Sequence, residues 1–227
     1  MLFKESLWFK KILGHHAQSN DIVLNIGSST RQFREQVQPH IHRNVFDPLR
    51  IRNIRVYHID CKSDQGVDLV GDVTDRRFIQ RLQRFHPTLA ICSNLLEHLE
   101  NRTLFCNELP AFLPSGGKLI VSVPYQYPYH PDPIDTLFRP TVEELAELFP
   151  SMKIIESTIL DCGTLAEKQR YERQIHFFKW LIRKLKSLIR LFLPFYKWSE
   201  WHQRILGRNR TNPALKCLVT CVVFQKL

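Results

Sequence analysis

The chain has 227 residues, of which 44% are hydrophobic, and a formal net charge of +10. This length and apolar content suffice for one α/β domain whose core needs no disulfide or metal. The six cysteines form no CxxC pair, and no stretch reaches the roughly 18 consecutive apolar residues that a membrane-spanning helix needs. The start, MLFKESLWFKKILG, lacks the apolar centre of a secretory signal, so we expect a cytoplasmic protein with reduced thiols.

The positive charge is concentrated in one segment. Residues 165–210 hold twelve Lys or Arg against three Glu, so the rest of the chain is nearly neutral. We therefore expect four parts: an N-terminal amphipathic helix (1–18), a core (19–164), a basic amphipathic helical insertion (165–212) and a last strand that returns to the core (213–227).

Short β-branched segments alternate with helical patterns along the chain. Strands are expected at 21–26, 54–59, 67–70, 88–93, 117–123, 152–160 and 215–225. Helices are expected at 75–84, at 95–112 in two pieces, and at 141–149, where a capping box opens the helix. Between the first two strands, prolines at 39 and 48 favour a short helix followed by a loop. This order predicts a doubly wound α/β sheet.

Polar residues follow several of the expected strands, where ligands bind in such a sheet. The turn NIGSST (25–30) lets the backbone approach a ligand at Gly27. Asp60 ends the second strand, where a carboxylate can accept both hydroxyls of a ribose, and Asp72 follows the third. The alternatives are an ordinary strand-to-helix turn at Gly27, a solvated turn residue at Asp60 and a helix cap at Asp72.

The series VLNIGSS, VYHID, VGDVTD, NLLEHL and LPSGGKLIVSVP resembles the motifs of class I S-adenosylmethionine-dependent methyltransferases. The resemblance covers roughly residues 20–164 and the final strand. It implies a seven-stranded, mostly parallel, Rossmann-like sheet with an antiparallel last strand, and S-adenosylmethionine as cofactor. By position, the resemblance implies that Gly27 flanks the methionine part of the cofactor and that Asp60 binds its ribose. It also implies that Asp72 and Val73 contact the adenine and that Asn94 lies on the sulfonium side. The expected cofactor-binding residues are Asn25, Gly27, Ser28, Ser29, Asp60, Asp72, Val73 and Asn94.

The sequence departs from this family pattern at two positions. Asn25 stands where the family usually has an acidic residue, and Ser29 where it has a second glycine. Asn25 can still position the turn by hydrogen bonds but carries no charge, and Ser29 adds a Cβ where the backbone approaches closely. These departures leave open a rival interpretation, a non-catalytic module that keeps the methyltransferase fold.

The expected acceptor side is the proline-rich loop VPYQYPYHPDPIDTLFRPT. His130 has a reference pKa near 6.5 and could take a proton from an acceptor hydroxyl, with Asp135 orienting or replacing it. Arg139 stays protonated and would anchor the loop or an anionic acceptor. Alternatively, His130 and Asp135 only satisfy backbone groups. Flat walls for a sugar ring are expected from Tyr125, Tyr127 and Tyr129.

The pattern PYHPDPIDTLFRPT resembles a subset of these methyltransferases found with polysaccharide and lipid-linked glycan biosynthesis, which implies O-methylation of a glycan or small hydroxyl acceptor. Glu97 and His98 also recur in the broader family, or else pack and cap the helix after the fourth strand. The sequence has no compact set of His, Asp and Glu ligands, so we expect no metal.

Residues 174–193 predict a strongly amphipathic basic helix. One interpretation is an interfacial helix on an anionic membrane, which would place the protein on the inner face of that membrane. The other is a lid helix that buries its apolar stripe on the sheet domain. Nucleic acid is a less favoured partner, and an RNA methyltransferase a less favoured function, because RNA binding explains the cations but not the apolar stripe.

Overall fold

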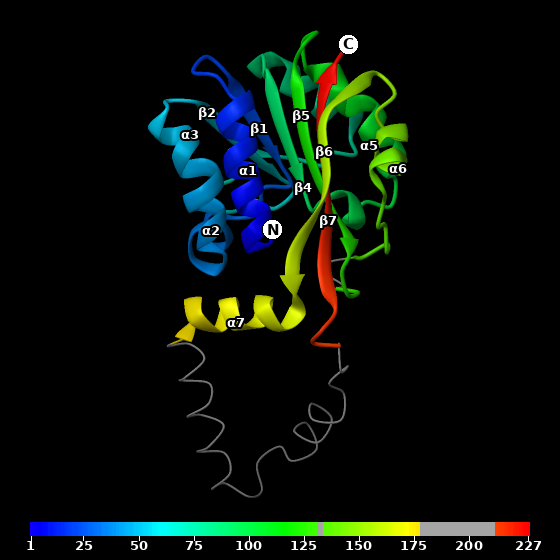
Figure 1. The fold of residues 1–227 in the computed structure, drawn as a ribbon. Coiled ribbons are helices and arrows are strands. Elements are labelled where there is room, and N and C mark those ends of the chain that lie inside the picture. Colours follow the sequence, from blue (N-terminus) through cyan, green and yellow to red (C-terminus); the bar gives the residue numbers. More distant parts are fainter. Residues whose placement is uncertain (131–133, 178–211) are drawn as a thin grey trace, which may run out of the picture. The chain divides into compact units, whose positions relative to one another are not determined.

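The computed structural model describes residues 1–130, 134–177 and 212–227, and divides into two compact units, Met1–Cys162 with Cys217–Leu227, and Gly163–Lys216. Seven strands form one sheet in the order β3-β2-β1-β4-β5-β7-β6 (Figure 1). Strands β1 to β5 pair in parallel and β7 runs antiparallel to β5, so the expected fold class is confirmed. The strands are β1 (Ile22–Ile26), β2 (Arg55–Asp60), β3 (Leu69–Val70), β4 (Leu89–Ser93), β5 (Lys118–Gln126), β6 (Met152–Thr164) and β7 (Lys216–Lys226).

Helix α1 (Phe3–His16) precedes β1, and the other helices lie between the strands in the alternation that the sequence predicts. These are α2 (Pro39–Ile41), α3 (Asp47–Ile51), α4 (Arg76–Leu82), α5 (Arg102–Glu108), α6 (Val142–Glu147) and α7 (Leu165–Ile175). The described residues also form two π-helical turns, η1 (Phe33–Val37) and η2 (His42–Phe46). They form three 3-10 turns, η3 (Gln83–Phe85), η4 (Leu96–His98) and η5 (Leu109–Phe112).

The connection between β1 and β2 differs from the expected short helix and loop. It is helical almost without interruption from Phe33 to Ile51. Pro39 and Pro48 stand in the first turns of α2 and α3, where a helix does not need the missing backbone N–H. The prolines therefore divide the helix into short pieces without ending it, and the two π-turns absorb the change in pitch.

Alternate residues of each central strand enter two separate cores, one on each face of the sheet. Val23, Ile91 and Val223 pack under α1, α2 and α3, whereas their neighbours Leu24 and Cys92 pack against α4, α5 and α6 (Figure 1). This two-sided burial explains why the middle strands read as continuous apolar runs. The apolar residues of α1 that lie in the first core are Trp8, Phe9, Ile12 and Leu13.

The basic insertion is described only in part. α7 opens with a capping box, in which Thr164 Oγ1 accepts a hydrogen bond from Glu167 N (3.2 Å) and Thr164 N donates to Glu167 Oε2 (3.0 Å). Most of the amphipathic segment 174–193 lies outside the described residues. Within the described part of the chain, no helix is long and apolar enough to cross a membrane.

The side chain of Glu5 on α1 is fully buried beside β4 and β5. Its Oε1 accepts hydrogen bonds from Ser122 Oγ (2.7 Å), Asn94 Nδ2 (2.8 Å) and, at 3.3 Å, Ser93 Oγ. Its Oε2 accepts one from the backbone N–H of Leu2 (2.7 Å). One carboxyl group therefore fixes the first helix to the ends of two neighbouring strands.

We expect Glu5→Gln to lower the free energy of unfolding by about 1–3 kcal/mol, because one acceptor oxygen becomes an amide that faces other donors in a buried place. Urea unfolding measures this, with the exposed Glu100→Gln as the matched control, expected to change stability by less than about 0.5 kcal/mol. Equal stability of the two variants would show that the buried network contributes nothing.

Candidate functional site

The turn after β1 has a left-handed backbone conformation at Gly27, where a side chain would also meet Leu95. Gly27 has φ 69°, and a Cβ there would lie 3.0 Å from Leu95 Cδ1. Ser29 also has positive φ, 54°, although it carries a Cβ. Ser29, which stands where the methyltransferase pattern has a second glycine, is therefore in the left-handed region, which costs energy that the surroundings must supply.

Asp60 supplies part of that energy. Its Oδ2 accepts a hydrogen bond from Ser29 N (2.7 Å) and its Oδ1 one from Lys62 N (3.0 Å). Asp60 thus stands at the end of β2, beside the turn, as the sequence predicts, and holds the strained Ser29 peptide. Cys61 Sγ also donates to Oδ1 (3.6 Å), so the acceptor capacity left for a sugar hydroxyl is the second lone pair of Oδ2.

Arg34 is a residue of this turn that sequence reasoning missed. Its side chain is buried, and its guanidinium donates to three carbonyl oxygens: Ser28 O (3.0 Å), Ser29 O (2.6 Å) and Gly66 O (2.7 Å). It therefore ties the turn after β1 to the loop after β2. In the sequence, Arg34 is marked only by its position in the first turn of the helical segment after the turn, and an arginine there is not specific to any function.

Asn25 lies on β1 beside His58 on β2, and Asn25 Nδ2 is 3.0 Å from His58 Nδ1. Burial, followed by the nearby charges of Arg34, His42 and Arg31, lowers the pKa of His58 to about 3. The imidazole is therefore neutral at pH 7 and accepts the amide hydrogen bond. This pair occupies the position where the family usually carries an acidic group.

Asp72 and Val73 follow β3. Asp72 is exposed, and its Oδ1 accepts from Thr74 N (2.8 Å) and Thr74 Oγ1 (2.7 Å). The cap of α4 is Asp75, whose side chain accepts from Arg77 N, so the capping alternative applies to Asp75 and not to Asp72. Val73 is buried in the core under α4.

Asn94 follows β4 with φ 49°, and its side chain donates to Glu5. Its backbone N–H donates to Ser122 O (2.8 Å), which joins the exits of β4 and β5. The expected cofactor-binding residues thus lie at the carboxyl ends of β1 to β4. Glu5 was missed because it comes from a helix that precedes the first strand.

The acceptor loop after β5 is organised around Asp135. Its two oxygens accept from Arg139 Nη1 (3.1 Å) and Arg139 Nη2 (2.7 Å), and Oδ2 also accepts from His130 N (3.0 Å). His130 Nδ1 lies 3.1 Å from the same Oδ2. These bonds, the Arg139 pair foremost among them, outweigh burial and lower the pKa of Asp135 to about 2, so Asp135 orients His130 and is not itself a base at neutral pH.

The three tyrosines of the loop differ in exposure. The ring of Tyr127 lies 5.1 Å from that of His130, edge to face, and Tyr125 is half-buried. Tyr129 is 61% exposed. The structure therefore brings Tyr127, His130, Asp135 and Arg139 together and leaves Tyr129 pointing to solvent.

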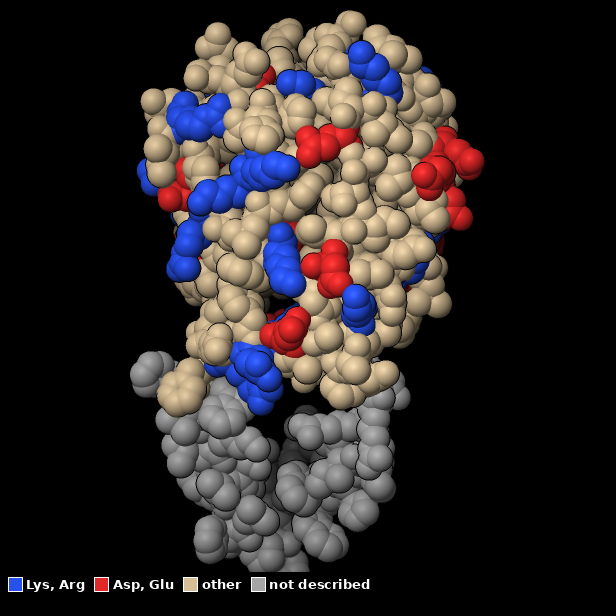
Figure 2. Space-filling view, in the orientation of Figure 1, with Lys and Arg blue, Asp and Glu red and all other residues tan. Residues whose placement is uncertain are grey.

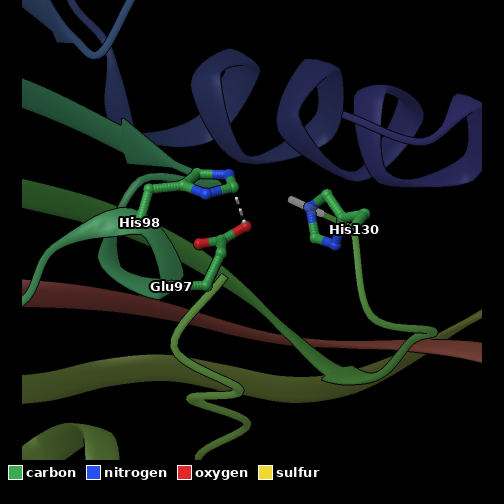
Figure 3. Close-up of side chains that lie close together, drawn as sticks. All are labelled: Glu97, His98 and His130. Atoms are coloured by element: carbon green, nitrogen blue, oxygen red, sulfur yellow. Dashed lines mark ion pairs between the residues drawn. The ribbon is translucent and has the colours of Figure 1, made fainter. Parts of the chain in front are cut away.

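Glu97 and His98, on η4 after β4, meet His130 at this place (Figure 3). One possible ligand atom from each of the three lies within 4.8 Å of the others. Glu97 is fully buried, and burial raises its pKa to about 8. Sequence analysis singled out all three residues but did not bring them together, because His130 follows a different strand.

We compared the chain with known proteins. No family model and no curated protein sequence matches it. Solved structures that match it include coclaurine N-methyltransferase bound to N-methylheliamine and SAH, at 12% identity over 98% of this chain and 71% of that one (TM-score 0.55). A putative methyltransferase from Bacillus halodurans matches at 12% identity over 98% and 99% (TM-score 0.55).

The chain has the fold of these methyltransferases. The same fold occurs in the [4+2]-cyclase SpnF, which is 12% identical over 97% of this chain and 80% of that one, with a TM-score of 0.56. Identities this low establish the architecture, and the chemistry has to be argued from the site.

We expect the stability of the protein to fall as the pH is lowered from about 6.5 toward 3, because the unfolded chain takes up a proton at His58 that the folded chain excludes. The slope from this residue approaches about 1.4 kcal/mol per pH unit. Urea unfolding of wild type and His58→Gln between pH 7.5 and 4 isolates it, since other groups cancel in the difference. A difference that stays constant over this pH range would contradict the assignment.

Proposed function

We propose that the protein is an S-adenosylmethionine-dependent methyltransferase. The observation that carries this is the strand order, with an antiparallel β7 between β5 and β6, combined with the Gly27 turn beside Asp60. The coclaurine N-methyltransferase of the same fold was crystallised with SAH. When bound, S-adenosylmethionine supplies an electrophilic methyl group.

The residues present fit such a cofactor at the carboxyl ends of the strands. Asp60 keeps acceptor capacity for a ribose hydroxyl, and the positive φ of Gly27 opens the turn. Asp72 Oδ1 accepts two hydrogen bonds from Thr74, whereas its Oδ2 accepts none from the described residues. Asn94 would lie near the sulfonium side, held by Glu5.

We further propose that the acceptor is a hydroxyl, on a glycan or a small molecule, bound against Tyr125 and Tyr127. His130 would take the hydroxyl proton, and this role is supported by its geometry, since its Nδ1 faces Asp135 and its Nε2 is left for the acceptor. A bound cofactor would supply the methyl group to the acceptor oxygen and keep the electron pair of the broken carbon–sulfur bond, while His130 would hold the proton released from the hydroxyl. Arg139 fixes the loop through Asp135.

A second candidate is a non-catalytic module of this fold. It is favoured by the intrachain bonds at the site, since Asn25 is paired with His58, Asn94 with Glu5, and Ser29 stands in place of glycine. The cyclase of the same fold supports the view that the architecture alone does not require methyl transfer.

We also propose that the protein attaches to an anionic membrane surface. The amphipathic basic segment 174–193 motivates this, although most of it lies outside the described residues. In the core unit, Figure 2 shows Lys and Arg side chains gathered over α1 to α3. The exposed cations of α1 include Lys4, Lys10 and Lys11.

We expect S-adenosylhomocysteine to bind at one site, and Asp60→Ala to weaken binding at least about tenfold by removing hydrogen bonds to a carboxylate. Calorimetric titration measures this, with the exposed Asp64→Ala as control. Melting curves without ligand separate loss of binding from loss of the fold, since Asp60 also holds Ser29. Absence of binding to the intact protein would refute the cofactor assignment.

We expect transfer of labelled methyl from S-adenosylmethionine to cell-envelope glycolipid in a single-turnover assay, reduced at least about a hundredfold in His130→Ala, as for loss of a general base. The glycolipid is presented in anionic vesicles, and flotation of the same mixture reports attachment. Cofactor binding without any transfer would favour the non-catalytic module.

The membrane proposal is tested in the same flotation experiment by replacing Phe178, Leu185 and Phe192 with Asp. If the variant floats as well as the wild type, the apolar stripe has no interfacial role.

A further inference from the structure

Glu97, His98 and His130 form a cluster whose members come from two loops. Glu97 and His98 follow β4, and His130 follows β5. His98 Nε2 lies 3.8 Å from Glu97 Oε1, and the two imidazole rings are 5.3 Å apart, edge to face. Figure 3 shows the carboxyl group of Glu97 below the ring of His98, with the ring of His130 to one side.

Glu97 is the unusual member of the cluster. It is 0% exposed, and within the described part of the chain neither of its carboxyl oxygens has a hydrogen-bond partner. Its main chain, in contrast, is held firmly, because Glu97 O accepts from both Thr136 N and Thr136 Oγ1 at 2.9 Å. Buried polar groups are almost always satisfied, so a fixed carboxyl without a partner indicates a missing ligand.

Both imidazoles are oriented by contacts at Nδ1. His98 Nδ1 contacts the carbonyl oxygen of Ile134. His130 Nδ1 lies 3.1 Å from Asp135 Oδ2 and 3.3 Å from Pro128 O. A proton on each Nδ1 satisfies these acceptors and leaves each Nε2 with a lone pair, which is the arrangement that carbonyl and carboxylate groups impose on metal-binding histidines.

We propose that Glu97, His98 and His130 bind a divalent first-row transition metal ion, with a fourth position left open. Two imidazoles and one carboxylate suit Zn²⁺ and its neighbours, whereas Mg²⁺ and Ca²⁺ prefer oxygen ligands. Tetrahedral bonds of about 2.0–2.1 Å require ligand atoms roughly 3.4 Å apart, so binding draws the present arrangement together.

This proposal departs from the expectation of no metal that the sequence supports. It does not depend on methyl transfer, although it bears on how that reaction would work. With an ion bound through Nε2, His130 is a ligand and does not take a proton at that nitrogen, and the open position would receive the acceptor oxygen instead.

Chelator-treated, full-length protein without cofactor or acceptor is titrated with Zn²⁺ by calorimetry and with Co²⁺ by absorption spectroscopy. We expect one site that also gives the visible bands of tetrahedral Co²⁺ with nitrogen and oxygen ligands. Glu97→Gln, His98→Gln and His130→Gln should each weaken Zn²⁺ binding at least about tenfold. The control is His42→Gln, which removes an imidazole 4.0 Å from both Glu35 and Asp47 on the surface.

Three results would overturn the proposal. The first is that the intact protein does not bind Zn²⁺, and the second is that the three variants bind it as tightly as the control. The third is a near-ultraviolet band of a Co²⁺–thiolate bond, which would assign the ion to a cysteine such as the exposed Cys61. Melting curves of the metal-free variants identify any that fail to fold, and the near-isosteric Glu97→Gln keeps the test decisive. Because S-adenosylhomocysteine binding is measured separately, failure here leaves the proposed function standing.

Discussion

The site depends on a buried carboxyl group contributed by the first helix. Glu5 accepts hydrogen bonds from Ser93, Asn94 and Ser122, so it fixes the exits of β4 and β5 relative to each other and to α1. The positive φ of Asn94 is held from both sides, by this carboxyl group and by the backbone bond to Ser122. Everything that follows β4, including the turn that carries Glu97 and His98, starts from this fixed point.

A second fixed point lies one strand away, where Asp60 and Arg34 hold the turn after β1. Asp60 binds the N–H of Ser29, and Arg34 binds its carbonyl oxygen, so the peptide groups on both sides of a left-handed serine are restrained. Such a position normally favours glycine. The substitution is therefore compatible with the turn because two charged side chains stabilise it, and the turn keeps its shape without the usual residue.

Local patterns were sufficient for the alternation of strands and helices, whereas the antiparallel last strand was expected only from the family resemblance. Strand positions followed from apolar runs and the helices from their caps, because both depend on neighbours in the sequence. The prediction of a loop at Pro39 and Pro48 was wrong. A proline breaks a helix in its middle, but these two prolines stand in first turns, where a helix tolerates them. Glu5, Arg34 and the Glu97 cluster could not be predicted, because their partners lie on other strands and only the fold brings them together.

The position of Glu5 also constrains the order of assembly. Its partners Ser93 and Ser122 lie 88 and 117 residues further along the chain, so during synthesis the first helix emerges long before the groups that satisfy its buried carboxyl. β5 in turn pairs with β7, which contains residues close to the end of the described chain. Contacts between such distant segments form slowly, since loop closure precedes any gain. Helix α1 is thus made before the strands that it binds and docks late, and the nascent chain has to keep the apolar side of this helix from other contacts until the sheet closes.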